Sequence, residues 1–99
     1  MNIPDKVRII GTDYPVIMES RLNDECKLCY GRIDRDQSNI KLNPDYSSQQ
    51  QEQTFLHEII HGICYHLHLD ILDNDEKTLD ILANGLYAFI KDNPDIFKE

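Results

Sequence analysis

Two histidines are spaced so that they can bind one metal ion, and the glutamate between them can act on a metal-bound water. Residues 57–61 read His-Glu-Ile-Ile-His, within a segment that predicts a helix over about residues 48–68. Residues four apart lie on one face of a helix, with Cβ atoms about 5–6 Å apart, so His57 and His61 can direct ring nitrogens at one ion. We expect zinc, which accepts neutral imidazole and tolerates a site with one position left to water. Glu58 is the carboxylate that can take a proton from that water.

The predicted helix has an apolar face that is distinct from the histidines. At about 100° per residue, one broad sector contains Phe55, Leu56, Ile59, Ile60, Ile63 and Leu67. His57 and His61 fall on an adjoining face, so the helix can bury one side and present the histidines on the other. The alternative is two partly exposed histidines on an amphipathic helix with no metal.

A catalytic zinc usually takes three protein ligands, so a third residue must join the histidines. A histidine six residues after His61 would complete one extended pattern, but that position is Leu67. Glu76 is a better candidate, because it begins a second helix, predicted over about residues 75–92, that a short connection can fold back across the first. Asp80, one turn later, can hydrogen-bond the other ring nitrogen of a liganding histidine.

The acidic residues near Glu76 have alternative roles that the sequence leaves open. Asp73 and Glu76 have the spacing of a capping box, and the helix dipole favours an acidic residue in a first turn. Asp73 or Asp75 could be the third ligand, or the zinc could have no third protein ligand. Asp80 could pair with Lys77 or face solvent. An oxyanion-stabilising donor is also required, and the candidates are Tyr65, His66, His68 and Tyr87.

These residues resemble the gluzincin branch of the zincin metallopeptidases, whose third ligand is a glutamate on a downstream helix with an aspartate four residues later. In a chain this short, residues 29–94 are similar to the minimal phage and bacterial zincin-like metallopeptidases of the ImmA/IrrE type, in which a small sheet precedes the HExxH helix. The resemblance implies a zinc metallopeptidase with His57, His61 and Glu76 as ligands. It also implies that Glu58 is the general base and that Asp80 holds a liganding histidine.

The expected mechanism is hydrolysis of a peptide bond. Zinc lowers the pKa of its bound water toward about 7, Glu58 accepts the proton, and the hydroxide attacks a peptide carbonyl polarised by the metal. An extended peptide or protein could add to a free strand edge beside the cleft, and a repressor-like regulator is one candidate partner. The competing interpretation is a binding module that keeps zinc for stability, or keeps none, and acts by docking onto a partner.

The first half of the chain predicts strands. Residues 7–10 and 14–19 suggest a hairpin around a Gly-Thr-Asp turn, with Pro15 favouring an edge or a strand start. Residues 28–34 and 39–43 predict two further strands. We therefore expect an α+β fold, in which a small antiparallel sheet of three to four strands packs on two main helices.

Polar residues predict where the two helices begin. Ser47 or Ser48 can cap the first helix, with Ser48 and Gln51 at capping-box spacing, and Asp73 or Asn74 can cap the second. The apolar stripe expected to bury the second helix consists of Leu79, Leu82, Leu86, Phe89 and Ile90.

Composition limits the remaining possibilities. A chain of 99 residues allows one domain, residues 1–99, with one modest core. A net charge of −8 argues against nucleic-acid binding, which requires a basic surface. The N-terminal segment has no signal-peptide pattern, and no segment has the eighteen or so apolar residues that span a bilayer. We therefore expect a cytoplasmic protein with no membrane partner.

The three cysteines favour free thiols over a disulfide framework. Their number is odd, and no signal peptide directs the chain to an oxidising compartment. Cys26 and Cys29 form a CxxC, but a structural zinc site requires a second pair, and only Cys64 remains. We expect Cys64 to be a buried small residue near the site. A thiol-dependent regulator that uses Cys26 and Cys29 is a third and weaker interpretation.

Overall fold

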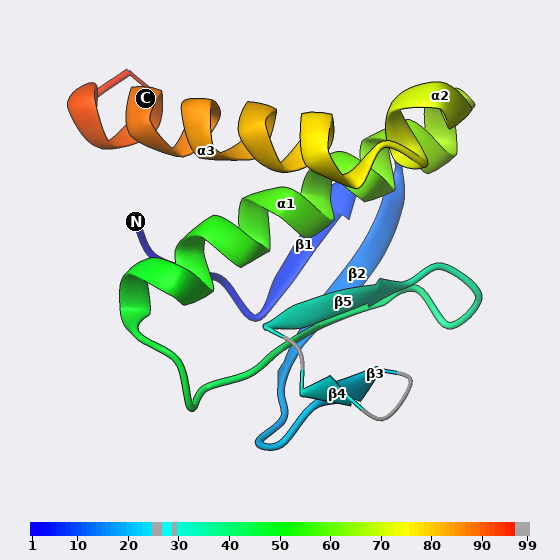
Figure 1. Cartoon of the computed structure of the whole chain (residues 1–99), viewed down its shortest axis with the longest axis horizontal. Helices are drawn as coiled ribbons and strands as arrows, with labels where there is room; N and C mark the ends of the chain where they lie inside the picture. Colours follow the sequence, from blue (N-terminus) through cyan, green and yellow to red (C-terminus); the bar gives the residue numbers. More distant parts are fainter. Residues whose placement is uncertain (25–26, 29, 97–99) are drawn as a thin grey trace.

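The protein is a three-layer α+β fold in the computed structural model, which describes residues 1–24, 27–28 and 30–96. A four-stranded sheet, in the order β1-β2-β6-β5, consists of β1 (Lys6–Ile9), β2 (Thr12–Met18), β5 (Gly31–Asp34) and β6 (Asn39–Leu42). A small separate hairpin consists of β3 (Asn23–Asp24) and β4 (Lys27–Leu28). The helices are α1 (Ser48–Leu67), α2 (Asp70–Asp73) and α3 (Glu76–Asp92). Helix α1 is the middle layer, with the sheet on one side and α3 on the other (Figure 1).

The α+β prediction is confirmed, but the sheet is mixed where the sequence predicted an antiparallel one. Strand pairs β1–β2 and β5–β6 are antiparallel, whereas β2 and β6 run parallel, with Val16 opposite Ile40. The two parallel strands are far apart in sequence, so their pairing depends on how the second hairpin docks on the first. Pro15 lies in an interior strand, yet the pairing with β6 begins only at Val16, so its missing N–H removes no bond from that ladder.

The two helix starts differ in detail from the prediction. Ser47 is the N-cap of α1, and its Oγ accepts a hydrogen bond of 3.1 Å from the Gln50 N–H. Ser48 is the first helical residue and forms no capping box. Asp75 caps α3 by accepting from the Thr78 N–H, so the predicted caps Asp73 and Asn74 are wrong. The reason is α2, an additional helical turn that moves the start of α3 to Glu76.

The inner face of α3 differs from the predicted stripe. Leu79, Ala83 and Tyr87 are buried, and the first two pack with Ile60 and Cys64 of α1. Of the predicted stripe, Leu79 is buried and Ile90 is half-buried, while Leu82, Leu86 and Phe89 are exposed. The prediction selected aliphatic and phenylalanine side chains and omitted Ala83 and Tyr87. The side of α3 that faces α1 is set by how the two helices pack, not by which apolar residues are largest.

Of the three cysteines, Cys64 is the one that lies within the residues described by the structure. Cys64 is 1% exposed, which confirms the prediction of a buried small residue, and burial raises the pKa of its thiol. Cys26 and Cys29 lie outside the described residues. Among the helices that the structure describes, none combines the length and the apolar content that a bilayer crossing requires.

Two glycines allow α1 to approach the sheet closely. A Cβ on Gly62 would lie 2.9 Å from Ile9 Cδ1 and 3.0 Å from Ile33 Cδ1. A Cβ on Gly31 would lie 2.7 Å from both the Lys41 carbonyl oxygen and Thr54 Cγ2. Because glycine has no Cβ at these two positions, β5 can lie directly over the histidine-bearing helix. The core beside them consists of Ile9, Tyr14, Ile40, Leu42 and Phe55.

We predict that Gly31→Ala destabilises the fold by about 1–3 kcal/mol, as overpacking of a filled site does. Chemical denaturation followed by circular dichroism measures the change. Adding Thr54→Ser should restore only part of the loss, because it removes the Cγ2 contact but leaves the Lys41 carbonyl in the sheet. A Gly31→Ala protein that unfolds at the wild-type denaturant concentration would contradict this close approach.

Candidate metal centre

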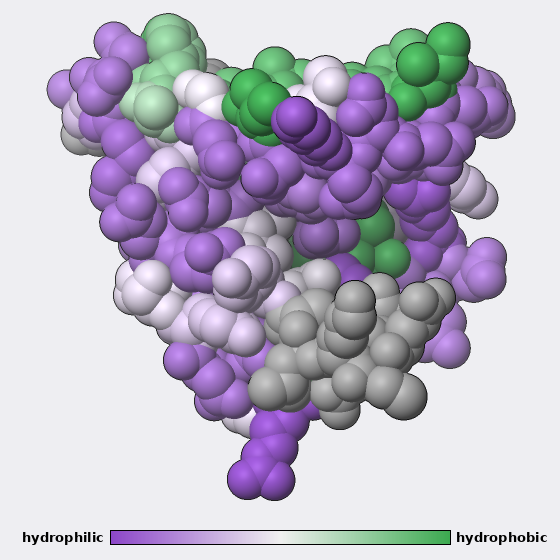
Figure 2. Space-filling view, viewed as in Figure 1, coloured by the Kyte–Doolittle hydropathy of each residue, from purple (hydrophilic) through white to green (hydrophobic). Residues whose placement is uncertain are grey.

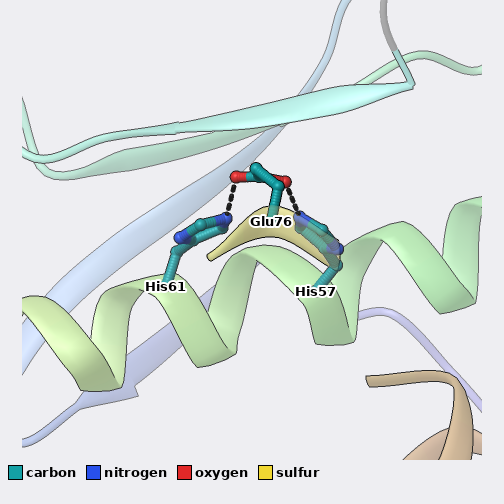
Figure 3. A group of neighbouring side chains, drawn as sticks. All are labelled: His57, His61 and Glu76. Carbon is teal, nitrogen blue, oxygen red and sulfur yellow. Dashed lines mark hydrogen bonds and ion pairs between the residues drawn. The ribbon is translucent and has the colours of Figure 1, made fainter. Parts of the chain in front are cut away.

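Helices α1 and α3 bring His57, His61 and Glu76 to one point. Each residue contributes one candidate ligand atom, and these atoms all lie within 4.8 Å of one another. His57 Nε2 is 3.1 Å from Glu76 Oε2, and His61 Nε2 is 2.6 Å from Glu76 Oε1 (Figure 3). The histidines project from successive turns of α1, and Glu76 meets them from the first turn of α3.

An aspartate holds the far nitrogen of each histidine ring. His57 Nδ1 is 3.0 Å from Asp80 Oδ1, and His61 Nδ1 is 2.7 Å from Asp73 Oδ1. Each Nε2 also faces a carboxylate oxygen, that of Glu76, so both ring nitrogens have an acidic partner. A metal ion between Nε2 and Glu76 would take the Nε2 lone pair and leave the proton on Nδ1, where the aspartate accepts it. Two such lone pairs and the Glu76 carboxylate then converge, and this donor set fits zinc.

Asp73 belongs to the site in a role that the sequence analysis did not consider. Arg35, in the connection between β5 and β6, donates to both of its oxygens, at 2.8 Å from Nη1 and 2.5 Å from Nη2. Arg35 Nη2 also donates to the His61 carbonyl oxygen at 3.4 Å. Burial alone would raise the pKa of Asp73, but its hydrogen bonds to Arg35 and His61 lower the pKa below the ordinary value. Asp73 is thus an ionised acceptor that orients His61.

No sequence signal identifies Arg35 as part of the site. It lies 38 positions before Asp73, in a segment that reads only as a strand connection. Asp73 carries the weak signal of an acidic residue near Glu76, which we interpreted as a helix cap or an alternative ligand. The structure instead gives the capping role to Asp75 and orients Asp73 toward His61.

Glu58 lines the same cleft as the two histidines. The cleft has a volume of about 690 Å³ and lies between β5 and α3. Glu58 is largely buried, and its Oε2 is 3.9 Å from His57 Nε2, on the side where a metal would sit. The rest of the lining is mostly polar and includes Tyr30, Arg32, Gln50, Gln53 and Asn84.

None of the four oxyanion-donor candidates lines this cleft. The His66 Nε2 is 2.7 Å from the Tyr14 hydroxyl, and the Tyr87 hydroxyl donates to Glu52. Tyr65 borders a different hollow beside Arg35, and His68 is the left-handed C-cap of α1. Described residues of the cleft lining that can donate hydrogen bonds include Tyr30, Arg32, Thr54 and the side-chain amides. No local spacing predicts them.

Comparison with family models, curated proteins and solved structures finds no match to this chain. The resemblance to gluzincins therefore stays a proposal that is supported by the residues and their geometry.

We predict that Asp73→Ala and Asp80→Ala each weaken zinc binding by about 10–100-fold, as loss of a partner that orients a liganding histidine does. Competition with a chromogenic chelator measures the affinity. Asp75→Ala is the matched control, because it removes the cap of α3 without contacting a histidine. If all three variants bind zinc as tightly as wild type, the two aspartates do not orient the rings.

Proposed function

We propose that this protein is a zinc-dependent metallopeptidase of the gluzincin type. The observation that carries the proposal is the convergence of two histidine Nε2 atoms on the Glu76 carboxylate, with an aspartate behind each ring. A site that only stabilised the fold would have no need of Glu58, a carboxylate largely buried in the same cleft. His57, His61 and Glu76 would hold the zinc, which leaves a fourth position open to water.

The residues of the cleft have separate roles in this reaction. Bound zinc supplies a Lewis acid that acidifies water and polarises a carbonyl. Glu58 accepts the proton of the attacking water and returns it to the leaving amine, as a general base and then a general acid. Asp80 and Asp73 fix the two ring orientations, and Arg35 fixes Asp73. The hydrogen bonds of Arg35 couple the strand connection to the metal-binding helix.

The sheet offers a binding site for an extended peptide. Strand β5 is the last strand in the order β1-β2-β6-β5, so one of its edges is not paired within that sheet. Gly31 and Arg32 of β5 line the cleft together with the histidines. A peptide or protein substrate can add to this edge through main-chain hydrogen bonds, which provide affinity with little sequence selectivity. We place this activity in the cytoplasm, where a repressor-like regulator is a candidate substrate.

We predict that Glu58→Gln retains zinc and fold but abolishes hydrolysis of a quenched-fluorescent peptide library, because the amide cannot accept the proton. Zinc content is measured on the same preparation by elemental analysis. Glu19→Gln is the control, because Glu19 pairs with Lys41 and does not line the cleft. Unchanged turnover in Glu58→Gln would contradict the catalytic role of Glu58. If Glu58→Gln loses hydrolysis but still replaces the wild-type protein in the cell, a binding module is favoured.

We predict that the wild-type chain binds one zinc and that Glu76→Ala weakens this binding severely, as His57→Ala and His61→Ala also do. Loss of a first-turn acidic residue alone would cost no more than a lost helix cap, about 0.5–2 kcal/mol of stability, and would leave zinc affinity unchanged. Zinc titration and thermal unfolding of the same variant separate the two effects. Wild-type zinc affinity in Glu76→Ala, with only a lower melting temperature, would exclude the gluzincin assignment.

A further inference from the structure

Helix α3 is apolar on two opposite sides. Its inner side buries Leu79, Ala83 and Tyr87. At about 100° per residue, Ile81, Gly85 and Phe89 lie on the opposite side. The large apolar side chains toward this outer side are exposed, with fractions of 62% for Ile81, 50% for Leu82 and 46% for Phe89. Leu86 lies beside Leu79, at the margin of the inner side. We define the outer face of α3 as Ile81, Leu82 and Phe89 with Gly85.

The outer face has the composition of a covered surface. A helix at the surface of a globular protein normally has one apolar stripe, and a helix that is apolar all round is normally buried. Helix α3 is nevertheless an outer layer of the molecule, with α1 beneath it (Figure 1). Hydrophobic residues gather along the edge of the surface where α2 and α3 lie (Figure 2). An exposed apolar patch of this kind marks an interaction site.

Gly85 gives this face a point of close approach. A Cβ added at Gly85 would meet no atom within 4 Å, so packing inside the chain does not require glycine there. Glycine is among the poorest helix formers in a helix interior. The large residues Ile81 and Phe89 stand one turn before and one turn after it. A second helix crossing at Gly85 would fit between them.

We infer that the outer face of α3 binds a second copy of this chain, with the two α3 helices antiparallel and crossing at Gly85. This arrangement has twofold symmetry, so each copy presents the same surface. It places Ile81 of each copy against Phe89 of the other, and Gly85 against Gly85. The inference is independent of the proposed peptidase activity.

Charge supports both the partner and the orientation. The chain carries 18 acidic residues and a net charge of −8, yet no acidic residue occurs from position 81 to position 91. Two copies can therefore approach along this segment with less repulsion than elsewhere. Lys77 lies near one end of the outer face and Asp92 near the other. Antiparallel pairing brings Lys77 beside Asp92 of the second copy, whereas parallel pairing would bring like charges together.

Sedimentation of the purified chain over a range of concentrations tests the inference. We expect a dimer of twice the 11.6 kDa chain mass. Its dissociation constant should be on the order of micromolar, because one helix pair lies at the low end of specific interface sizes. A chain that stays monomeric up to about 1 mM, far above that constant, would overturn the inference.

Two variants locate the interface. Gly85→Gln should leave the monomer folded, because the site is open, but should block the crossing. Phe89→Glu should raise the dissociation constant by about 30-fold or more, as loss of an aromatic anchor does. Met18→Glu is the control, a similar change at an exposed apolar residue of β2. Circular dichroism verifies the fold of each variant, and a dimer unaffected by both interface changes would overturn the assignment to this face.

A charge exchange tests the orientation. Lys77→Glu alone should weaken the dimer several-fold, and adding Asp92→Lys in the same chain should restore wild-type affinity. If the double variant is as weak as or weaker than the single one, the antiparallel arrangement is wrong.

Discussion

The candidate metal centre depends on one packing contact, the burial of Leu79 and Ala83 of α3 against Ile60 and Cys64 of α1. Glu76 lies about one helical turn before Leu79, so seating Leu79 brings the Glu76 carboxylate to the histidines. Asp80 directly follows Leu79 and reaches His57 from the same turn. Because protein interiors are close-packed, a small shift of α3 would move both carboxylates away from the rings.

The same region concentrates negative charge. Glu58, Glu76, Asp73 and Asp80 all lie at or beside the two histidines, in a chain whose net charge is already −8. Arg35 offsets part of this charge through its two hydrogen bonds to Asp73. Like charges held close together destabilise a folded protein unless a cation compensates them. In the proposed function zinc supplies that compensation, which would couple metal binding to the stability of the α1–α3 contact.

The sheet and α3 form the two walls of the cleft. Gly31 allows β5 to lie close to α1, and Gly31 and Arg32 of this end strand line the cleft. Helix α3 contributes the opposite wall with Glu76, Asp80 and Asn84. Its outer face points away from the cleft, so a second chain bound there would leave the edge of β5 accessible.

The sequence by itself determined what depends on local periodicity. Backbone geometry places residues four apart on one helical face, so the pairing of His57 with His61 and of Glu76 with Asp80 could be predicted from spacing. Alternating and turn residues likewise predicted most strands, and the α+β class follows from them. Spacing alone could not place Glu76 and Asp80 near the histidines. Their proximity follows from the packing of α3 on α1.

Only the tertiary structure decided which distant segments meet. The parallel pairing of β2 with β6, the contact of Arg35 with Asp73, and the use of Ala83 in place of Leu82 on the inner face of α3 depend on packing between segments far apart in sequence. No local pattern encodes such contacts, because each is set by the shapes and charges of surfaces that exist only after folding. For the same reason, the polar lining of the cleft could not be predicted from the sequence.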